Sequence, residues 1–145
     1  MPDHYSITVT DKPDPAETQF VEDGMLAYNL QYAPPYNHQR LAVFLYADDG
    51  TLCGGALGHT WWGWLRIDMV WLNEALRGQG WGTHLMQAAE GEAIRRGCHH
   101  AFLDTMSFQA LPFYLRLGYE VFAHLDDLPT GHQMYFMKKA LPAQL

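Results

Sequence analysis

The stretch RGQGWG, residues 77–82, places three glycines directly before the amphipathic pattern THLMQAAEGEAIRR. In that pattern apolar side chains recur at helical spacing, and Gly97 follows as a C-terminal stop. Residues 62–72, WGWLRIDMVWL, precede the glycines and are typical of a strand, apolar on both faces near its end. Glycines between a strand and a helix let a ligand approach the amides at the helix N-terminus, where a phosphate is favoured. The loop therefore predicts either a phosphate site or a turn whose glycines serve geometry alone.

Two common phosphate-binding loops have sequence motifs that differ from RGQGWG. A P-loop requires GxxxxGK followed by Ser or Thr, and no lysine follows the glycines here. A Rossmann loop requires GxGxxG early in a βαβ unit, whereas this chain has GxGxG halfway along. A nucleotide binder with an unorthodox loop is the weakest of the interpretations that stay open.

The other patterns predict a mixed α/β fold. A chain of 145 residues with 48% hydrophobic residues suits one domain, 1–145. Periodicity and turn signals place its elements in this order: a strand at 5–10, a helix or two short helices at 14–32, a hairpin at 41–61, the strand at 62–72, the helix after the glycines, a strand at 99–105, a helix at 108–117, and strands at 119–125 and 132–141.

Composition excludes several classes of protein. The net charge of −7 leaves no basic stripe for nucleic acid, although it would suit a cationic substrate. Cys53 and Cys98 lie outside any CxxC pattern, and the adjacent His99 and His100 would point to opposite faces of a strand, so we expect no disulfide framework and no metal site. Neither a signal peptide nor a membrane span is recognisable, which predicts a soluble cytoplasmic protein without a membrane partner.

Two motifs resemble one enzyme family. RGQGWG matches the RxxGxG signature of the GNAT N-acetyltransferases, and ALPFYLRLGY at 110–119 is similar to the later AxxFYxxxGF segment of that family. The motifs occur in the family's order, and the resemblance covers nearly the whole chain. It implies a single-domain α/β (α+β) GNAT fold, whose mixed central β-sheet is flanked by helices and splays after the fourth strand, here at 69–72. It also implies acetyl-coenzyme A as acetyl donor, with the pantetheine arm in the gap.

The resemblance assigns backbone roles to the strand end and the loop. Main-chain groups of Val70 and Leu72 would face the pantetheine. Backbone amides along the loop would surround the diphosphate, namely those of Arg77, Gly78, Gln79, Gly80, Trp81, Gly82 and Thr83. The Arg77 side chain would either face a phosphate or only stabilise the loop, and Arg116 would either reach the donor's 3′-phosphate or lie on a solvated face.

Tyr114 matches the family tyrosine that acts as general acid toward the departing thiolate. The alternative is an aromatic core residue beside Phe113. The attacking amine must also lose a proton, and Asp68, Glu74 and ordered water are the candidate bases, with Asp68 preferred. Ser107 is a departure, because many relatives carry asparagine three residues before the alanine of the second motif.

Two classes of function follow. The first is transfer of an acetyl group to a primary amine by direct attack, without a covalent enzyme intermediate. The second is a non-catalytic coenzyme A or acyl-coenzyme A sensor or interaction subunit, against which Tyr114 beside an acidic strand argues. The acceptor is expected to be a small molecule or a peptide. The sequence fixes neither its identity, nor the acyl-chain preference, nor the oligomeric state, although family members often form homodimers.

Overall fold

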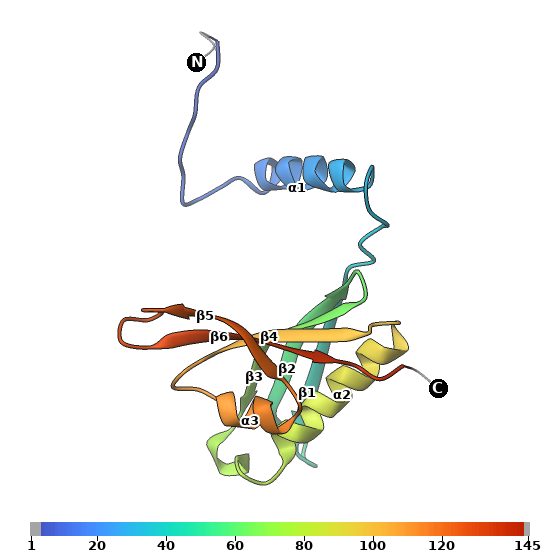
Figure 1. The fold of residues 1–145 in the computed structure, drawn as a ribbon, viewed down its shortest axis with the longest axis vertical. Coiled ribbons are helices and arrows are strands. Elements are labelled where there is room, and N and C mark those ends of the chain that lie inside the picture. Colours follow the sequence, from blue (N-terminus) through green and yellow to red (C-terminus); the bar gives the residue numbers. More distant parts are fainter. Residues whose placement is uncertain (1–3, 144–145) are drawn as a thin grey trace. The chain divides into compact units, whose positions relative to one another are not determined.

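The computed structural model describes residues 4–143, and the chain divides into two compact units, Met1–Pro35 and Tyr36–Leu145. That the chain forms one domain, 1–145, stays a prediction. The first unit contains helix α1 (Pro15–Asn29), drawn in blue in Figure 1. Asp14 caps this helix, because its carboxylate accepts a hydrogen bond of 2.9 Å from the amide of Ala16. One continuous helix therefore forms where one or two were expected.

The strand predicted at residues 5–10 is wrong, because these residues have no regular structure. Tyr5, Ile7 and Val9 alternate in the strand manner, yet their side chains are 79%, 81% and 93% exposed. A strand forms only where its backbone groups pair with a neighbour, and no strand of the described chain pairs with this segment. An alternating pattern shows only that a segment could form a strand, and the strand forms only if a neighbouring strand is there to pair with it.

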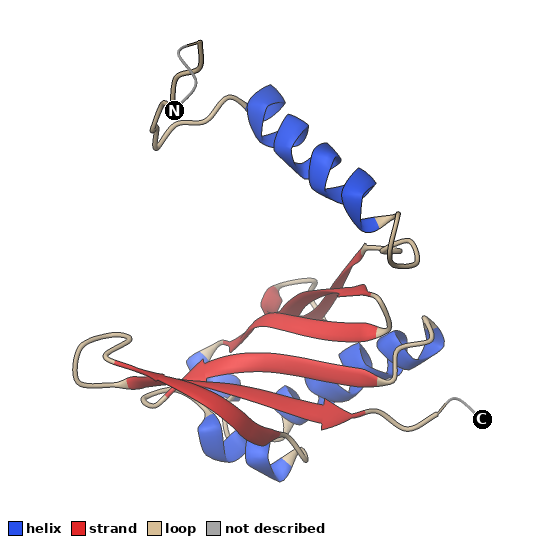
Figure 2. Cartoon of the chain, turned by 45° about the horizontal axis from the view of Figure 1, so that its top comes forward, coloured by secondary structure: helices blue, strands red, loops and turns tan. Residues whose placement is uncertain are grey.

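The second unit is built on a six-stranded mixed sheet of order β1-β2-β3-β4-β6-β5. Its strands are β1 (Gln39–Tyr46), β2 (Leu52–Trp61), β3 (Trp64–Leu72), β4 (His100–Met106), β5 (Glu120–Asp126) and β6 (Gln133–Ala140). Only β3 and β4 are parallel neighbours. A 3₁₀ turn, η1 (Glu74–Leu76), and helices α2 (Trp81–Arg95) and α3 (Leu111–Arg116) complete the unit. Figure 2 shows these helices on one side of the sheet, so the predicted mixed α/β fold is confirmed.

The sheet opens between β3 and β4. These strands pair only from Trp64 with His100 to Ile67 with Leu103, although β3 continues to Leu72. A bulge lies at the same place, because Leu57 pairs with Met69 and Gly58 with Ile67, which leaves Asp68 without a partner on β2. The predicted splay is therefore present. It follows the third strand rather than the fourth, since residues 5–10 contribute none.

The core lies between the sheet and the two helices. Helix α2 buries Leu85, Met86, Ala89 and Ala93, which recur every three or four residues and form one face. This face packs on β1, β2 and β3. Tyr114 of α3 joins the same cluster of buried residues. The glycine loop is thus held between a central strand and a firmly packed helix.

A polar network is buried beneath α2. Glu90 is 8% exposed and accepts hydrogen bonds from the Tyr119 hydroxyl at 3.2 Å and from Lys139 Nζ at 2.7 Å. Burial, and after it the charge of Glu90, raises the pKa of the Tyr119 phenol above its ordinary value. Tyr119 is therefore a protonated donor in a structural contact.

We expect Glu90→Ala to lower the free energy of unfolding by about 2–3 kcal/mol, because it leaves the Lys139 ammonium without its partner in a partly buried site. Urea denaturation measures this loss. Glu92→Ala on the surface of the same helix is the control, with an expected loss below about 1 kcal/mol. Equal losses in both variants would mean that the buried network adds no more than a surface ion pair.

Candidate functional site

A cavity of about 510 Å³ lies where β3 separates from β4. The end of β3, the glycine loop, the first turn of α2 and one side of α3 form its wall. The lining residues are Val70, Trp71, Leu72, Arg77, Gly78, Gly80, Gly82, Thr83, Ala110, Phe113, Tyr114, Arg116 and Leu117. The structure thus brings together eight of the residues predicted from the sequence for donor binding and catalysis.

The glycine loop turns into α2 through backbone conformations that favour glycine. Gly78 and Gly80 have φ of 73° and 90°, and Gly80 is the N-cap residue of α2 in a left-handed conformation. No side chain caps the N-terminus of α2. The amides of its first turn are therefore left for another acceptor, at the positive end of a 15-residue helix.

This end of the cavity is the candidate site for a phosphate group. Gly80, Gly82 and Thr83 all line it, so the uncapped helix end and the cavity coincide. A Cβ atom added at Gly82 would lie 3.2 Å from Cζ of Phe113, which shows how closely α3 approaches the first turn of α2. The absence of a side chain at Gly80 and Gly82 keeps the amides accessible.

Two side chains of the loop bind the loop itself. Arg77 Nε donates a hydrogen bond of 3.1 Å to the carbonyl of Leu72, and Gln79 Nε2 donates one of 2.8 Å to the carbonyl of Ala75. Of the two roles predicted for Arg77, loop stabilisation is thus realised by this contact. Gln79 and Trp81 do not line the cavity, and the Trp81 ring instead contacts the ring of His84, with centroids 5.6 Å apart.

Strand β3 presents one free edge to the opening. Val70 pairs with Ala56 on β2, but β4 has no partner for it on the other side. Its main-chain groups on that side are therefore available to a ligand, as predicted for an extended arm in the gap. The carbonyl of Leu72, in contrast, already accepts the Arg77 bond.

Tyr114 is the buried aromatic of the cavity wall, with 7% of its surface exposed. Burial, and after it the negative charge of Asp104, raises the pKa of the Tyr114 phenol to about 12. Within residues 4–143, no hydrogen bond engages its hydroxyl, in contrast to the Tyr119 hydroxyl that binds Glu90. Tyr114 is thus a protonated donor that faces the cavity without an internal acceptor.

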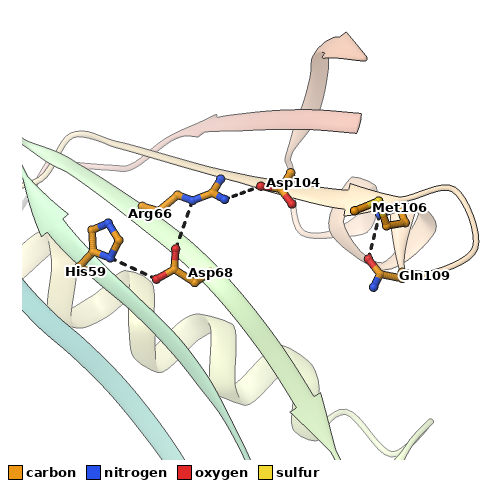
Figure 3. Close-up of polar contacts among 6 residues, drawn as sticks. All are labelled: His59, Arg66, Asp68, Asp104, Met106 and Gln109. Carbon is orange, nitrogen blue, oxygen red and sulfur yellow. Dashed lines mark hydrogen bonds and ion pairs between the residues drawn. The ribbon is translucent and has the colours of Figure 1, made fainter. Parts of the chain in front are cut away.

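Asp68 lies outside the cavity, in an ionic cluster on the other face of the sheet (Figure 3). Its carboxylate is 3.1 Å from Nδ1 of His59 and 3.3 Å from Nε of Arg66. The Arg66 guanidinium also binds Asp104 on β4, so it bridges the two strands where they separate. The sequence pattern points to Asp68 but not to His59, Arg66 and Asp104, because only the strand register shows that these residues meet.

Comparison with known proteins identifies the family. The profile of the acetyltransferase (GNAT) family matches residues 2–119. The chain belongs to the GNAT acetyltransferase family. An acetyltransferase of Agrobacterium fabrum is 34% identical over 134 residues, 92% of this chain and 98% of that protein. The blasticidin-S acetyltransferase of Streptomyces morookaense is 37% identical over 101 residues, 69% of this chain and 74% of that protein.

Solved structures agree on the GNAT fold. The crystal structure of an acetyltransferase from Agrobacterium tumefaciens has a TM-score of 0.86 and 33% identity, and the match covers 94% of this chain and 99% of that chain. The resemblance inferred from two short motifs is therefore confirmed. The chain is a GNAT-type acyltransferase, in agreement with the names of its relatives.

The second GNAT motif supplies further cavity residues, beyond those predicted for donor binding and catalysis. Ala110 and Phe113 lie inside the motif and line the cavity, so the signal was present in the sequence. Ser107, which replaces the more usual asparagine, is 3.1 Å from His132 Nδ1 and accepts a bond of 3.1 Å from the amide of Gln133. It therefore ties the segment before α3 to β6.

Within residues 4–143, no three or more His, Cys, Asp or Glu side chains are grouped in a way that could hold a metal ion. No helix in the same range is long and apolar enough to cross a membrane. The cytoplasmic location stays a prediction.

Proposed function

We propose that the protein transfers an acetyl group from acetyl-coenzyme A to a primary amine of a small molecule or peptide, with Tyr114 as general acid. The observation that carries this proposal is that an uncapped helix N-terminus, a free strand edge and a buried phenol line the same cavity. The same arrangement gives each part of a long thioester donor a matching group. The match of residues 2–119 to the family, which runs across the boundary between the two units, supports a single functional domain.

The loop and the strand bind and orient the donor. Amides of Gly78, Gly80 and Gly82 would hold the diphosphate against the positive end of α2. Main-chain groups of Val70 would hold the pantetheine arm along the free edge of β3. When bound in this way, acetyl-coenzyme A supplies the acetyl thioester close to Tyr114.

Tyr114 holds the proton that the reaction needs on sulfur. Expulsion of a thiolate is easier when a nearby acid protonates it as the C–S bond breaks. The raised pKa, about 12, keeps the Tyr114 phenol protonated at neutral pH, and Tyr114 lines the cavity. Burial also keeps bulk water from competing for this proton.

A small-molecule amine is the preferred acceptor class. One relative is named for blasticidin S, which makes that antibiotic a rational first candidate. The net charge of −7 favours the approach of a cationic amine over that of an anion. Specificity for blasticidin S itself is a separate question, which turnover measurements answer.

Calorimetric titration with acetyl-coenzyme A, ATP and NADH tests donor binding. We expect acetyl-coenzyme A to bind with a micromolar Kd, equivalent to about 8 kcal/mol, and the two nucleotides to bind at least about 100-fold more weakly. Preference for ATP or NADH would contradict the assignment of the glycine loop.

Release of coenzyme A thiol then tests turnover, with blasticidin S, spermidine and a short peptide with a free N-terminus as acceptors. Mass spectrometry of the product should show the addition of one acetyl group to the amine. Tight binding of acetyl-coenzyme A without acetylation of any tested amine would favour the non-catalytic sensor instead.

A further inference from the structure

The ionic cluster of His59, Arg66, Asp68 and Asp104 lies beside the point where β3 and β4 separate, on the face of the sheet opposite the helices (Figure 3). Asp68 and Asp104 directly follow Ile67 and Leu103, the last pair that joins β3 to β4. Successive strand residues point to opposite faces, so these carboxylates face away from the buried Ile67 and Leu103. The cluster therefore flanks the gap from outside, while Tyr114 borders it from the cavity side.

The two sides of the gap are close enough to interact. The charge of Asp104 contributes to the raised pKa of the Tyr114 phenol. An acceptor amine that enters from the open face would thus pass the cluster before it reaches a thioester held near Tyr114. Within residues 36–143, helices α2 and α3 lie on the other face of the sheet, so no helix of that unit covers the cluster.

His59 is oriented like a histidine that acts as a base. Its Nδ1 lies 3.1 Å from the Asp68 carboxylate, so in the neutral ring Nδ1 carries the hydrogen and Nε2 carries the lone pair. No hydrogen bond from the described residues engages Nε2. The side chain is 29% exposed and packs against the ring of Trp61, with centroids 4.9 Å apart. A carboxylate thus fixes the ring while the other nitrogen stays accessible.

The charges around His59 come from three neighbouring segments. Arg40 on β1 and Arg66 on β3 are its direct partners in the sheet register, and the ring of His38 lies 5.1 Å from its own. Asp68 contacts both His59 and Arg66. Arg66 therefore occupies one side of the Asp68 carboxylate, which leaves His59 as the better-placed group to take up a proton at the open face.

We propose that His59, positioned by Asp68, is the general base that removes a proton from the acceptor ammonium at the open face of the sheet. This inference rests on the proposed acetyl transfer. It assigns Asp68 a positioning role in place of the base role predicted from the sequence, and it locates the acceptor over β2, β3 and β4. Tyr114 and His59 then act from opposite sides of one gap.

The proton balance needs no further reactant. The ammonium gives one proton to His59 Nε2, which later releases it to water. The free amine nitrogen attacks the thioester carbonyl carbon, the C–N bond forms and the C–S bond breaks. Sulfur takes the bonding electron pair and a proton from Tyr114, and the second proton lost by nitrogen returns to Tyr114 through water.

The test compares His59→Gln with wild type, using the amine from the thiol-release panel that wild type acetylates fastest. At pH 7 we expect kcat/KM to fall by about 10- to 100-fold, while the affinity for acetyl-coenzyme A changes by less than about twofold. The difference in kcat/KM between His59→Gln and wild type should decrease as the pH rises, because the amine then loses its proton to water without a general base. Added imidazole should restore part of the activity of His59→Ala.

His124→Gln is the matched control, because His124 also faces an aspartate, with Nε2 3.7 Å from Oδ1 of Asp126, but lies on the edge strand β5. We expect it to behave as wild type. Full activity of His59→Gln together with a deficient Asp68→Asn would overturn the proposal and make Asp68 the base. A deficit independent of pH and of imidazole would also overturn it, in favour of a structural role. Wild-type binding of acetyl-coenzyme A without any amine acetylation would refute the proposed function, and this inference with it.

Discussion

Tyr114→Phe is expected to lower kcat by about 10- to 1000-fold, while the affinity for acetyl-coenzyme A changes by less than about twofold. The substitution removes one hydroxyl and keeps the ring, so the contacts of Tyr114 with the core are preserved. Because no hydrogen bond within residues 4–143 engages that hydroxyl, its loss leaves no buried partner unsatisfied. Steady-state kinetics and calorimetric titration measure the two effects separately.

The pH dependence gives the same prediction a second readout. A pKa raised to about 12 means that the Tyr114 phenol loses its proton only at a pH well above the ordinary value for tyrosine. Activity that depends on this proton should persist to about pH 11, about one unit below the raised pKa, whereas with an ordinary phenol it would begin to fall near pH 9. In Tyr114→Phe the residual activity should lack this alkaline loss.

Tyr46→Phe is the control for Tyr114→Phe, because Tyr46 on β1 is 59% exposed and does not line the cavity. It should keep wild-type kcat. Tyr114→Phe with wild-type turnover would show that Tyr114 is a core aromatic beside Phe113, the alternative that the sequence leaves open. The general acid would then be sought among other groups of the cavity.

Much of the candidate donor side of the site could be predicted from the sequence because it depends on local structure. Gly78 and Gly80 determine backbone conformations within a few residues, and the second motif places Tyr114 on a short helix. Both signals are short-range, so a single sequence carries them completely. The cavity lining confirms that these two segments meet.

The proposed acceptor side could not be predicted in the same way. His59 and Arg66 face each other only because β2 and β3 pair in one particular register, and Asp104 joins them only through the parallel β3–β4 contact. A one-residue slip of a strand would send each side chain to the other face. The failure at residues 5–10 has the same physical origin, because pairing partners are set by tertiary structure.

Gly82→Val is expected to weaken acetyl-coenzyme A binding by at least about 100-fold, equivalent to about 2.7 kcal/mol. Even a Cβ at this position would lie 3.2 Å and 3.3 Å from two ring atoms of Phe113, and the two methyl groups of valine would add further bulk at the first turn of α2. A diphosphate held by these amides would lose both its access and its hydrogen bonds. Calorimetric titration measures the change in Kd.

Gly91→Val is the matched control, because Gly91 lies in the same helix and a Cβ added there meets nothing within 4 Å. Both substitutions introduce the same poor helix former, so their difference isolates the effect on the site. Arg77→Ala should weaken binding by only about 10-fold, since the Arg77 side chain stabilises the loop through one hydrogen bond to the Leu72 carbonyl. Equal and negligible effects of Gly82→Val and Arg77→Ala would mean that the diphosphate does not bind at the helix end. The glycines would then serve only the turn between β3 and α2.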